Sequence, residues 1–249
     1  MSESKKRLDV AVHECGLAQS RQRARSLIMA GKVLVNENIF DKPGVMVSRT
    51  DILSLKEPDM PFVSRGGIKL EAAFKEFNID VNELICLDVG ASTGGFTDCL
   101  LKHGAKKVFA VDVGYGQLAW VLRQDDRVIT IERTNIRYML PETLGCLVDF
   151  VTIDVSFISL KTVVPVVIKF LKSTACIIAL IKPQFEVGKG KVGKGGVVKD
   201  TLLHTEVVNS LSDFFSKTGL DIEGVIPSPI FGPKGNKEFL VYMKYQRNN

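Results

Sequence analysis

The sequence predicts an α/β protein with a mostly parallel, doubly wound sheet and a smaller α+β unit before it. A short apolar run, Ile85–Val89, passes into a glycine-rich turn and then into a helical stretch. Further apolar runs of strand length alternate with helical patterns along the rest of the chain. Only a proline-rich loop separates the last two strand-like runs, so we expect the final strand to run antiparallel.

The composition is that of an ordinary globular protein. The 249 residues are 45% hydrophobic, which suffices for one large and one small domain. The net charge of +5 is mild, so only clustered basic residues would indicate nucleic-acid binding. The five cysteines form no C-x-x-C pair, which predicts free thiols and no metal site. The sequence has no apolar leader and no spanning segment, which predicts a cytoplasmic protein without membrane contact.

The first 56 residues pattern as two helices followed by β-like pieces. Residues 5–16 and 21–30 are expected to be helices, the second capped by Ser20, and residues 32–35 and 51–55 to be strands. Basic residues gather here, and they fit either a solvated surface or a face that binds phosphates: Arg7, Arg21, Arg23, Arg25 and Lys32.

The order of residues from Arg7 to Asp51 closely resembles the small RNA-binding domain named after ribosomal protein S4. In that family the second helix and the following loop contact structured RNA. The resemblance therefore implies RNA contacts by Arg21, Arg23, Arg25 and Lys32.

A domain boundary is expected at residues 57–61, which contain two prolines and no periodicity. This divides the chain into domains 1–60 and 61–249. A helix over 68–77 follows, with an apolar stripe that excludes Lys69. From this spacing alone, Lys69 is predicted to be solvated.

The glycine-rich turn and the next strand predict a nucleotide-like ligand. Asp112 ends the strand expected over 108–113, about 20 residues beyond the turn, where a carboxylate accepts hydrogen bonds from ribose hydroxyls. An acid that only caps the strand end is the alternative. Because Ser92 stands where the dinucleotide fingerprint needs glycine, a nicotinamide or flavin cofactor is disfavoured.

Three later strand-like runs each end in polar residues. These are Glu132–Asn135, Asp154–Phe157 and Lys182–Glu186, and they predict one functional crevice. The remaining strands are expected at 128–131, 148–155, 175–181, 224–227 and 238–243, and the helices at 94–102, 117–123, 159–171 and 199–218.

The segment Gly188–Lys194 has the spacing of a phosphate-binding P-loop. Gly195 stands where Ser or Thr must hold Mg²⁺, so we expect a mobile basic loop instead. Its lysines either touch RNA phosphates or are solvated: Lys189, Lys191 and Lys194.

From Ser64 to Glu238 the sequence resembles the FtsJ-like RNA 2′-O-methyltransferases, and the whole chain resembles TlyA-type ribosomal RNA methyltransferases. The motifs that carry the resemblance are Asp88–Phe96, Asp112–Trp120, Asp154–Leu160 and Lys182–Gly190. It implies a Rossmann-like S-adenosylmethionine-dependent methyltransferase sheet and 2′-O-methylation of cytidines in ribosomal RNA. Some members carry an older label as hemolysins.

The resemblance also assigns the site. The family's Lys-Asp-Lys-Glu tetrad falls on Lys69, Asp154, Lys182 and Glu238. A lysine accepts a proton only in its neutral form, which a second ammonium nearby favours, so Lys182 is the expected base. Asp154 would orient it and Glu238 would hold the hydroxyl. The donor would be bound by Asp88, Gly90, Ala91, Ser92, Thr93, Gly94, Gly95, Phe96, Asp112 and Asn135.

The substrate is expected to be ribosomal RNA or a ribosomal subunit, and no protein partner is indicated. Because the chain ends eleven residues after Glu238, it resembles the shorter forms restricted to the large subunit. Two alternatives are an RNA-binding protein with an inactive methyltransferase domain and a membrane-active hemolysin. A nicotinamide oxidoreductase is more distant.

Overall fold

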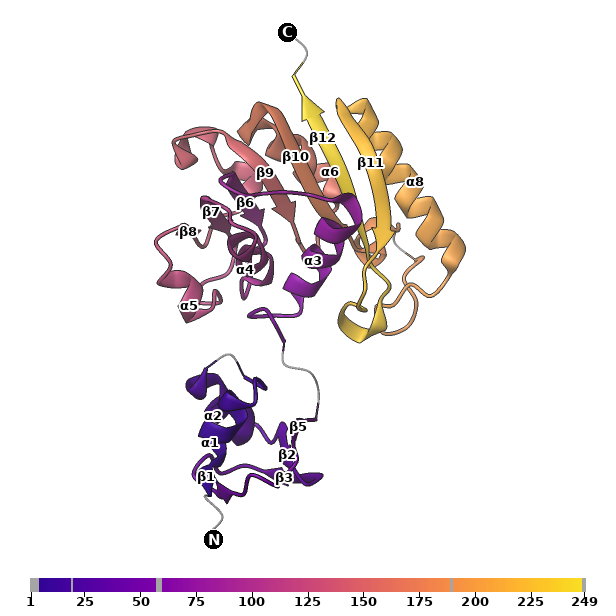
Figure 1. The fold of residues 1–249 in the computed structure, drawn as a ribbon. Coiled ribbons are helices and arrows are strands. Elements are labelled where there is room, and N and C mark those ends of the chain that lie inside the picture. The colour runs from indigo at the N-terminus through magenta and orange to yellow at the C-terminus, as the bar shows by residue number, and fades with distance from the viewer. Residues whose placement is uncertain (1–4, 19, 57–59, 189, 248–249) are drawn as a thin grey trace. The chain divides into compact units, whose positions relative to one another are not determined.

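The computed structural model describes residues 5–18, 20–56, 60–188 and 190–247. The chain forms two compact units, Met1–Met60 and Pro61–Asn249. Figure 1 shows the elements of both units. Among the described residues, no helix is long and apolar enough to cross a membrane.

The small unit packs two helices against short strands. Its elements are β1 (Lys6–Arg7), α1 (Leu8–Glu14), α2 (Arg21–Met29), β2 (Val33–Val35), β3 (Asn38–Phe40), β4 (Met46–Val47) and β5 (Leu53–Leu55). Leu8, Val12, Ile28 and Val33 form its buried core. The Ser20 Oγ accepts a hydrogen bond from the Arg23 N–H at 3.1 Å, which caps α2 as the sequence predicts.

Two differences from the prediction concern short strands in this unit. The first helix starts at Leu8 and not at residue 5, because Lys6 and Arg7 pair with Val47 and Met46 across the β1–β4 ladder. The strands β3 and β4 were not predicted. Strand β3 is mostly exposed and β4 has only two residues, so neither shows an apolar alternation.

One seven-stranded sheet organises the large unit, in the order β11-β12-β10-β9-β6-β7-β8. The strands are β6 (Ile85–Val89), β7 (Lys107–Val111), β8 (Val128–Ile131), β9 (Val148–Ile153), β10 (Leu171–Ile181), β11 (Leu220–Pro227) and β12 (Phe239–Gln246). The pairs β10–β9, β9–β6, β6–β7 and β7–β8 are parallel. Strand β12 is antiparallel to both β10 and β11, which confirms the expectation for the final strand.

Helices cover both faces of this sheet (Figure 1). One layer contains α3 (Gly66–Phe77) and α4 (Gly95–Lys102), and the other contains α6 (Leu160–Val167) and α8 (Thr201–Lys217). The shorter helices are α5 (Trp120–Arg123), α7 (Pro183–Glu186) and the 3-10 turns η1 (Ile136–Tyr138), η2 (Pro141–Leu144), η3 (Ile168–Phe170) and η4 (Pro233–Gly235). The doubly wound α/β class is confirmed.

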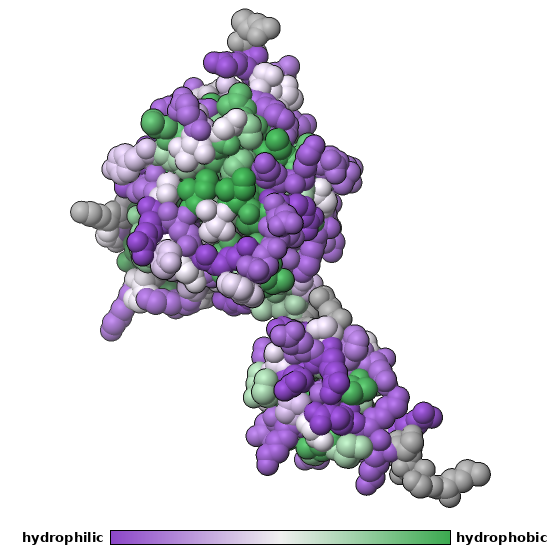
Figure 2. Space-filling model, turned by 90° about the vertical axis from the view of Figure 1, so that its left-hand side faces the viewer, coloured by the Kyte–Doolittle hydropathy of each residue, from purple (hydrophilic) through white to green (hydrophobic). Residues whose placement is uncertain are grey.

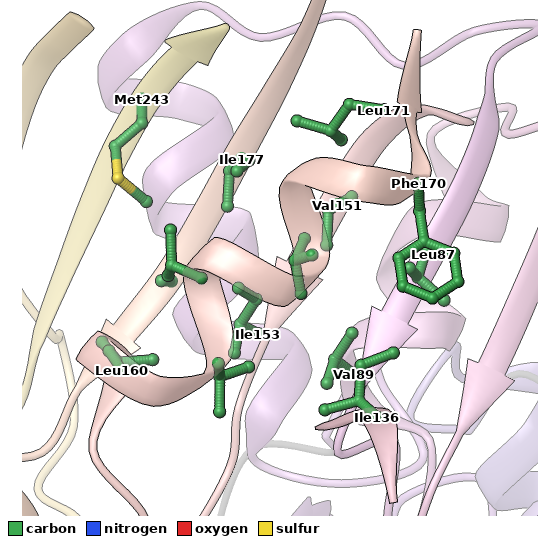
Figure 3. Close-up of a cluster of buried hydrophobic side chains, with 14 of the residues drawn as sticks. Leu87, Val89, Ile136, Val151, Ile153, Leu160, Phe170, Leu171, Ile177 and Met243 are labelled. Carbon is green, nitrogen blue, oxygen red and sulfur yellow. The ribbon is translucent and has the colours of Figure 1, made fainter. Parts of the chain in front are cut away.

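Strand β10 shows why the sheet has two cores. Ile177, Ala179 and Ile181 belong to the cluster under α6, whereas Ile178 and Leu180 belong to the cluster under α3 and α4. Side chains alternate between the faces of a strand, so a continuous apolar run is buried on both. Figure 3 shows the first cluster, with the α6 side chains lying over the sheet. Each fully buried aliphatic side chain contributes about 1.5–3 kcal/mol.

Several element ends differ from the prediction. Strand β10 begins at Leu171 and not at residue 175. The prediction missed its first four residues because they include the exposed polar residues Ser173 and Thr174, which interrupt the apolar run. The helix predicted over 159–171 ends at Val167 and continues as η3. Strand β11 starts at Leu220, four residues early, and its partly exposed positions likewise lack a continuous apolar run.

Strand β8 forms one edge of the sheet and leaves apolar surface beside it. Figure 2 shows green surface on the side of the large unit where β8 and α5 lie in Figure 1. Exposed apolar side chains on these two elements include Trp120, Val121 and Ile129. The sheet therefore ends here beside the short helix α5, which leaves these apolar side chains exposed.

Candidate functional site

The turn after β6 requires glycine at two positions. Gly90 has φ +85°, and a Cβ there would lie 2.5 Å from the Asp154 carbonyl oxygen. Gly94 has φ +97°, and a Cβ there would lie 2.2 Å from the Leu122 side chain. Because both the positive φ and the close approach exclude a side chain, the backbone is held against the ends of neighbouring strands. The turn then enters α4.

Asp88 lies beneath this turn and does not line a cavity. It is fully buried, and its carboxylate accepts hydrogen bonds from Thr97 Oγ1 at 2.6 Å and Thr152 Oγ1 at 2.8 Å. Burial raises the pKa of Asp88 to about 6, against the opposing effect of the two threonines. The prediction that Asp88 contacts the donor is therefore corrected: its hydrogen bonds tie β6 to β9 and to α4.

A cavity of about 490 Å³ lies at the carboxyl ends of β6, β7 and β9. This volume falls in the range of about 300–1,000 Å³ that small-molecule sites occupy. It is lined by four of the predicted donor residues, Gly90, Ser92, Asp112 and Asn135, and by others that include Gln117, Thr134, Arg137, Asp154, Ser156 and Phe157.

The two predicted recognition residues in this cavity are held by local hydrogen bonds. The Asp112 carboxylate accepts from the Ser92 N–H at 2.8 Å and from the Gly114 N–H at 2.7 Å, which fixes its orientation. A carboxylate has about four acceptor sites, so it can accept further donors. The Asn135 Oδ1 accepts from the Arg137 N–H at 3.1 Å and caps η1.

A second cavity of about 280 Å³ contains all four residues of the predicted tetrad. Gly90, Ser92, Asp154 and Ser156 line both cavities, so the two adjoin. The other lining residues are Ser64, Arg65, Gly66, Lys69, Ala91, Thr93, Gly95, Phe96, Lys182, Gly232, Pro233 and Glu238. The glycine turn thus separates a larger hollow from a smaller charged one.

Four different elements bring the tetrad together. Lys69 belongs to α3, Asp154 follows β9, Lys182 follows β10 and Glu238 precedes β12. Strands β9 and β10 are adjacent and parallel, and β12 pairs with β10, so these strand ends meet at one edge. Lys69 is only 7% exposed, and the prediction of a solvated lysine from spacing alone is wrong. The apolar stripe of the helix does not reveal this burial, because the amine pairs with Glu238, which lies 169 positions away in the sequence.

The tetrad forms two ion pairs, each between a lysine and a carboxylate. Lys69 Nζ lies 2.6 Å from Glu238 Oε2, and Lys182 Nζ lies 2.6 Å from Asp154 Oδ1. Lys182 also donates to Ser156 Oγ at 3.0 Å. The side chains of both lysines and of Glu238 are nearly or fully buried. The two lysines and the two carboxylates, of which Asp154 is 22% exposed, therefore balance in charge within one cavity.

Glu238 keeps one acceptor atom without a hydrogen bond. Its Oε1 is buried and has no hydrogen-bond partner among the described residues. A Cβ at position 232 would lie 2.0 Å from this oxygen, so only glycine fits beside it. A buried unsatisfied carboxylate oxygen is costly in a folded protein and is typical of a site that receives a donor from a ligand.

The predicted RNA-contact residues of the small unit are partly engaged internally. Asp9 is buried and pairs with Arg7 Nε and Arg21 Nε, each at 3.0 Å. The hydrogen bond from Arg7 outweighs burial and holds the pKa of Asp9 below its ordinary value. Arg21 and Arg25 line a shallow hollow on α2. These ion pairs fix the arginine stems and leave the half-exposed guanidinium groups at the surface.

The other predicted basic contacts lie on the surface. Lys32 and Lys194 are exposed, and Lys191 pairs with Glu206 at 3.2 Å. Lys189 lies outside the described residues. The residues from 190 to 200 contain no helix, consistent with a loop in place of a P-loop. Within the large unit, Lys191 and Lys194 line neither cavity.

The sequence places Ser156 and Phe157 in a predicted crevice segment but gives neither a role of its own, and it gives Arg65 none. Ser156 holds Lys182, and Arg65 lines the charged cavity, but single serines and arginines in loops carry no periodic signal. Phe157 is 90% exposed with φ +63°, and its ring lies 4.9 Å from that of Phe185. An exposed aromatic residue in a sparsely populated backbone conformation is a sign of function that only coordinates reveal.

Together, the mostly parallel sheet with one antiparallel strand and the paired cavities at its carboxyl edge define an S-adenosylmethionine-dependent methyltransferase. A solved structure from Listeria monocytogenes, provisionally named as such an enzyme, shares the fold with a TM-score of 0.54 and 20% identity over 74% of this chain and 100% of that chain. The chain belongs to the FtsJ-like methyltransferase family, whose profile matches residues 62–245. An S4 domain profile matches residues 6–53.

Two relatives match nearly the whole chain. The 16S/23S rRNA (cytidine-2′-O)-methyltransferase TlyA of Mycobacterium tuberculosis is 47% identical over 96% of this chain and 90% of its own length. A solved structure from Streptococcus thermophilus, provisionally called a hemolysin, is 42% identical with a TM-score of 0.76, over 99% of this chain and 90% of that chain. The predicted family resemblance is confirmed.

Proposed function

We propose that this protein uses S-adenosylmethionine to methylate the 2′-hydroxyl of a cytidine ribose in ribosomal RNA. The observation that carries the proposal is the convergence of Lys69, Asp154, Lys182 and Glu238 on one cavity beside the glycine turn. The S4 domain and the similarity to an enzyme named for this reaction support the substrate class. A ribosomal RNA substrate supports a cytoplasmic location.

The residues of the larger cavity fit the donor. Gly90–Phe96 would surround its methionine portion, the Asp112 carboxylate would accept hydrogen bonds from the ribose, and Asn135 would contact the adenine edge. When bound, S-adenosylmethionine supplies a methyl group on a sulfonium, which an oxygen nucleophile can attack. The protein's own contribution is to hold the RNA hydroxyl in position and to remove its proton.

The charged cavity would perform the proton transfer. A ribose hydroxyl is a weak nucleophile at neutral pH, so Lys182 Nζ, in its neutral form, would accept the hydroxyl proton. Asp154 and Ser156 hold this amine from two sides. The unsatisfied Oε1 of Glu238 would accept a hydrogen bond from the incoming hydroxyl, and Lys69 keeps that carboxylate in place.

The exposed ring of Phe157 suits a nucleobase. It lines the larger cavity and offers one face to solvent while it packs on Phe185. Unpaired RNA bases stack on aromatic side chains, and such stacking contributes about 1–3 kcal/mol per base. A cytidine whose base rests on Phe157 would have its ribose near the strand ends.

Methyl transfer from labelled donor to isolated large and small ribosomal subunits tests the proposal. We expect Lys182→Ala to lose methyl transfer almost completely and to bind RNA as the wild type does. Lys172→Ala is the matched control, because Lys172 pairs with Asp149 on the surface and lines neither cavity.

The outcomes separate the alternatives. Transfer to one subunit alone identifies that subunit as the substrate. RNA binding without transfer to either subunit would favour an RNA-binding protein with an inactive domain. Leakage from lipid vesicles, with no transfer, would favour a hemolysin. Full activity of Lys182→Ala would remove Lys182 as the base.

A further inference from the structure

Three side chains with metal-ligand chemistry meet between α3 and α4, outside both cavities. They are Glu71 on α3 and Cys99 and His103 on α4, and their ligand atoms all lie within 4.8 Å of one another. Cys99 and His103 are four residues apart and therefore share one face of α4. We propose that they form a binding site for a divalent transition metal, for which zinc is the best chemical match.

The donor set suits zinc. A thiolate, an imidazole and a carboxylate are the three protein ligand types of Zn²⁺, and sites with three of them leave a fourth position for water. Hard cations such as Mg²⁺ and Ca²⁺ prefer oxygen ligands alone, so the sulfur and nitrogen donors exclude them. His103 is partly exposed, which gives the ion and a water molecule a path from solvent.

The distances require only a small adjustment. Tetrahedral zinc with bonds of about 2.0–2.3 Å holds neighbouring ligand atoms roughly 3.3–3.7 Å apart. Cys99 Sγ lies 3.9 Å from Glu71 Oε2, which is already close to that separation. His103 Nε2 lies 2.6 Å from the same oxygen, as a hydrogen bond. These two atoms must part by under about 1 Å, which side-chain rotation can supply.

The surroundings can admit a cation, hold the imidazole and keep the thiol protonated until a metal binds. Lys75 now pairs with Glu71 at 3.0 Å, but its side chain is 75% exposed and can turn into solvent when a metal binds. Phe74 packs edge-on against His103, with ring centroids 4.9 Å apart, and holds the imidazole plane. Burial, with help from Glu71, raises the pKa of the Cys99 thiol above its ordinary value.

Binding is then an exchange that balances in atoms and charge. The Cys99 S–H bond breaks and a sulfur–metal bond forms, and the proton passes to solvent. Glu71 exchanges its contacts with His103 and Lys75 for a bond to the metal. His103 Nε2 gives up the proton that it now donates to Glu71 and binds the metal, and the neutral ring then carries its one proton on Nδ1. No electron is transferred, because zinc keeps its oxidation state.

The position of the site gives it a consequence. Lys69 lies two residues before Glu71 on α3, and α4 begins at Gly95 in the glycine turn. A metal would therefore link α3 and α4, which both contribute residues to the lining of the charged cavity. The site lies off the path of methyl transfer, so its occupancy is measured without donor or RNA.

The sequence predicts no metal site, because its cysteines form no C-x-x-C pair. The cluster instead has one cysteine, with a histidine four positions later and a glutamate 28 positions earlier. The glutamate reaches the other two residues only because α3 packs on α4.

Cobalt titration of the full chain tests the proposal, because a Co²⁺–thiolate bond gives a charge-transfer absorption in the near ultraviolet. We expect one equivalent to bind with this absorption, and zinc to displace it. Cys99→Ser should abolish the absorption, and His103→Gln should weaken binding at least about tenfold. Cys146→Ser and His13→Gln are the matched controls, since both residues lie outside the cluster.

Circular dichroism spectra show whether each variant is folded, and the half-exposed His103 is the substitution least able to disturb the fold. The proposal is overturned if the wild type gives no thiolate absorption at metal concentrations about tenfold above the protein. It is equally overturned if folded Cys99→Ser and His103→Gln both bind cobalt as tightly as the wild type.

Discussion

Replacing Lys69 by methionine removes one partner of the buried Lys69–Glu238 ion pair and keeps the shape of the side chain. The two charged atoms lie 2.6 Å apart, and the side chains are 9% and 0% exposed. The variant leaves the Glu238 carboxylate buried without its cation. Because solvent cannot screen that charge, the loss of stability should be large.

The expected cost is about 3–5 kcal/mol, the range for a buried pair that loses one partner. In a domain of this size, 1 kcal/mol corresponds to roughly 2–4 °C in the melting temperature, so we expect a fall of about 6–20 °C. In the double variant Lys69→Met/Glu238→Gln no charge is left unpaired. Its stability should return to within about 1–2 kcal/mol of the wild type.

Thermal and urea unfolding followed by circular dichroism measures these differences, and methyl transfer is measured in parallel. The matched control is Lys244→Met, which removes the same kind of partner from an exposed pair with Glu223 at 2.8 Å. That change should cost at most about 1 kcal/mol. The double variant should remain inactive despite its recovered stability, which separates the catalytic role from the structural one.

The prediction is contradicted if the free energy of unfolding of Lys69→Met lies within about 1 kcal/mol of the wild-type value. A buried carboxylate without its cation must destabilise the fold by more than that. It also fails if the double variant is no more stable than Lys69→Met. Wild-type methyl transfer by a folded double variant would show that the pair has no part in the reaction.

Three further predictions follow from the structure. Gly90→Ala should abolish donor binding in calorimetry and lower the free energy of unfolding by several kcal/mol, because its Cβ would lie 2.5 Å from the Asp154 carbonyl oxygen. The control Gly116→Ala, with open space around it, should lower that free energy by only about 1–2 kcal/mol. The pKa of Asp88 is raised to about 6 from 3.8, so its contribution to stability is fully present below pH 3.8 and is lost as pH rises through 6. Unfolding measured from pH 4 to 7 should therefore show a stability decrease of about 3 kcal/mol in the wild type that is absent from Asp88→Asn; identical pH profiles would contradict it. Arg25→Ala should weaken RNA binding evenly across sequences and reduce the slope of log K against log salt by about 1, and an unchanged slope would show that Arg25 contacts no phosphate.

The prediction of the fold succeeded where local patterns were strong. The continuous apolar run of β10 and the glycine turn after β6 are visible in the sequence because burial on both faces and a positive φ each restrict the residue types allowed. The prediction failed for the short strands β3 and β4 and for the first residues of β10. Strand β3 is mostly exposed, and pairing with a distant strand determines the conformation of β4 and of the start of β10, so the residues themselves carry little preference.

The site divides in the same way. The resemblance to a family assigned Lys69 to the tetrad, whereas its place on the predicted helix indicated solvent. Only the packing of α3 beside the start of β12 explains how a lysine off the apolar stripe becomes buried against Glu238. The support of Lys182 by Ser156 could not be predicted, since loop geometry decides which of many serines faces an amine.

By itself, the sequence determined the α/β class, through the short-range periodicity of its strands and helices. Its resemblance to known families gave the two domain types and nominated the residues that would hold a nucleotide ligand or move a proton, because both rest on residue order and need no coordinates. The tertiary structure alone decided which charges pair, that Asp88 lies beneath the turn and outside the cavity, and that Glu71, Cys99 and His103 meet. Such contacts depend on the register and packing of elements far apart in the chain, and no local pattern encodes them.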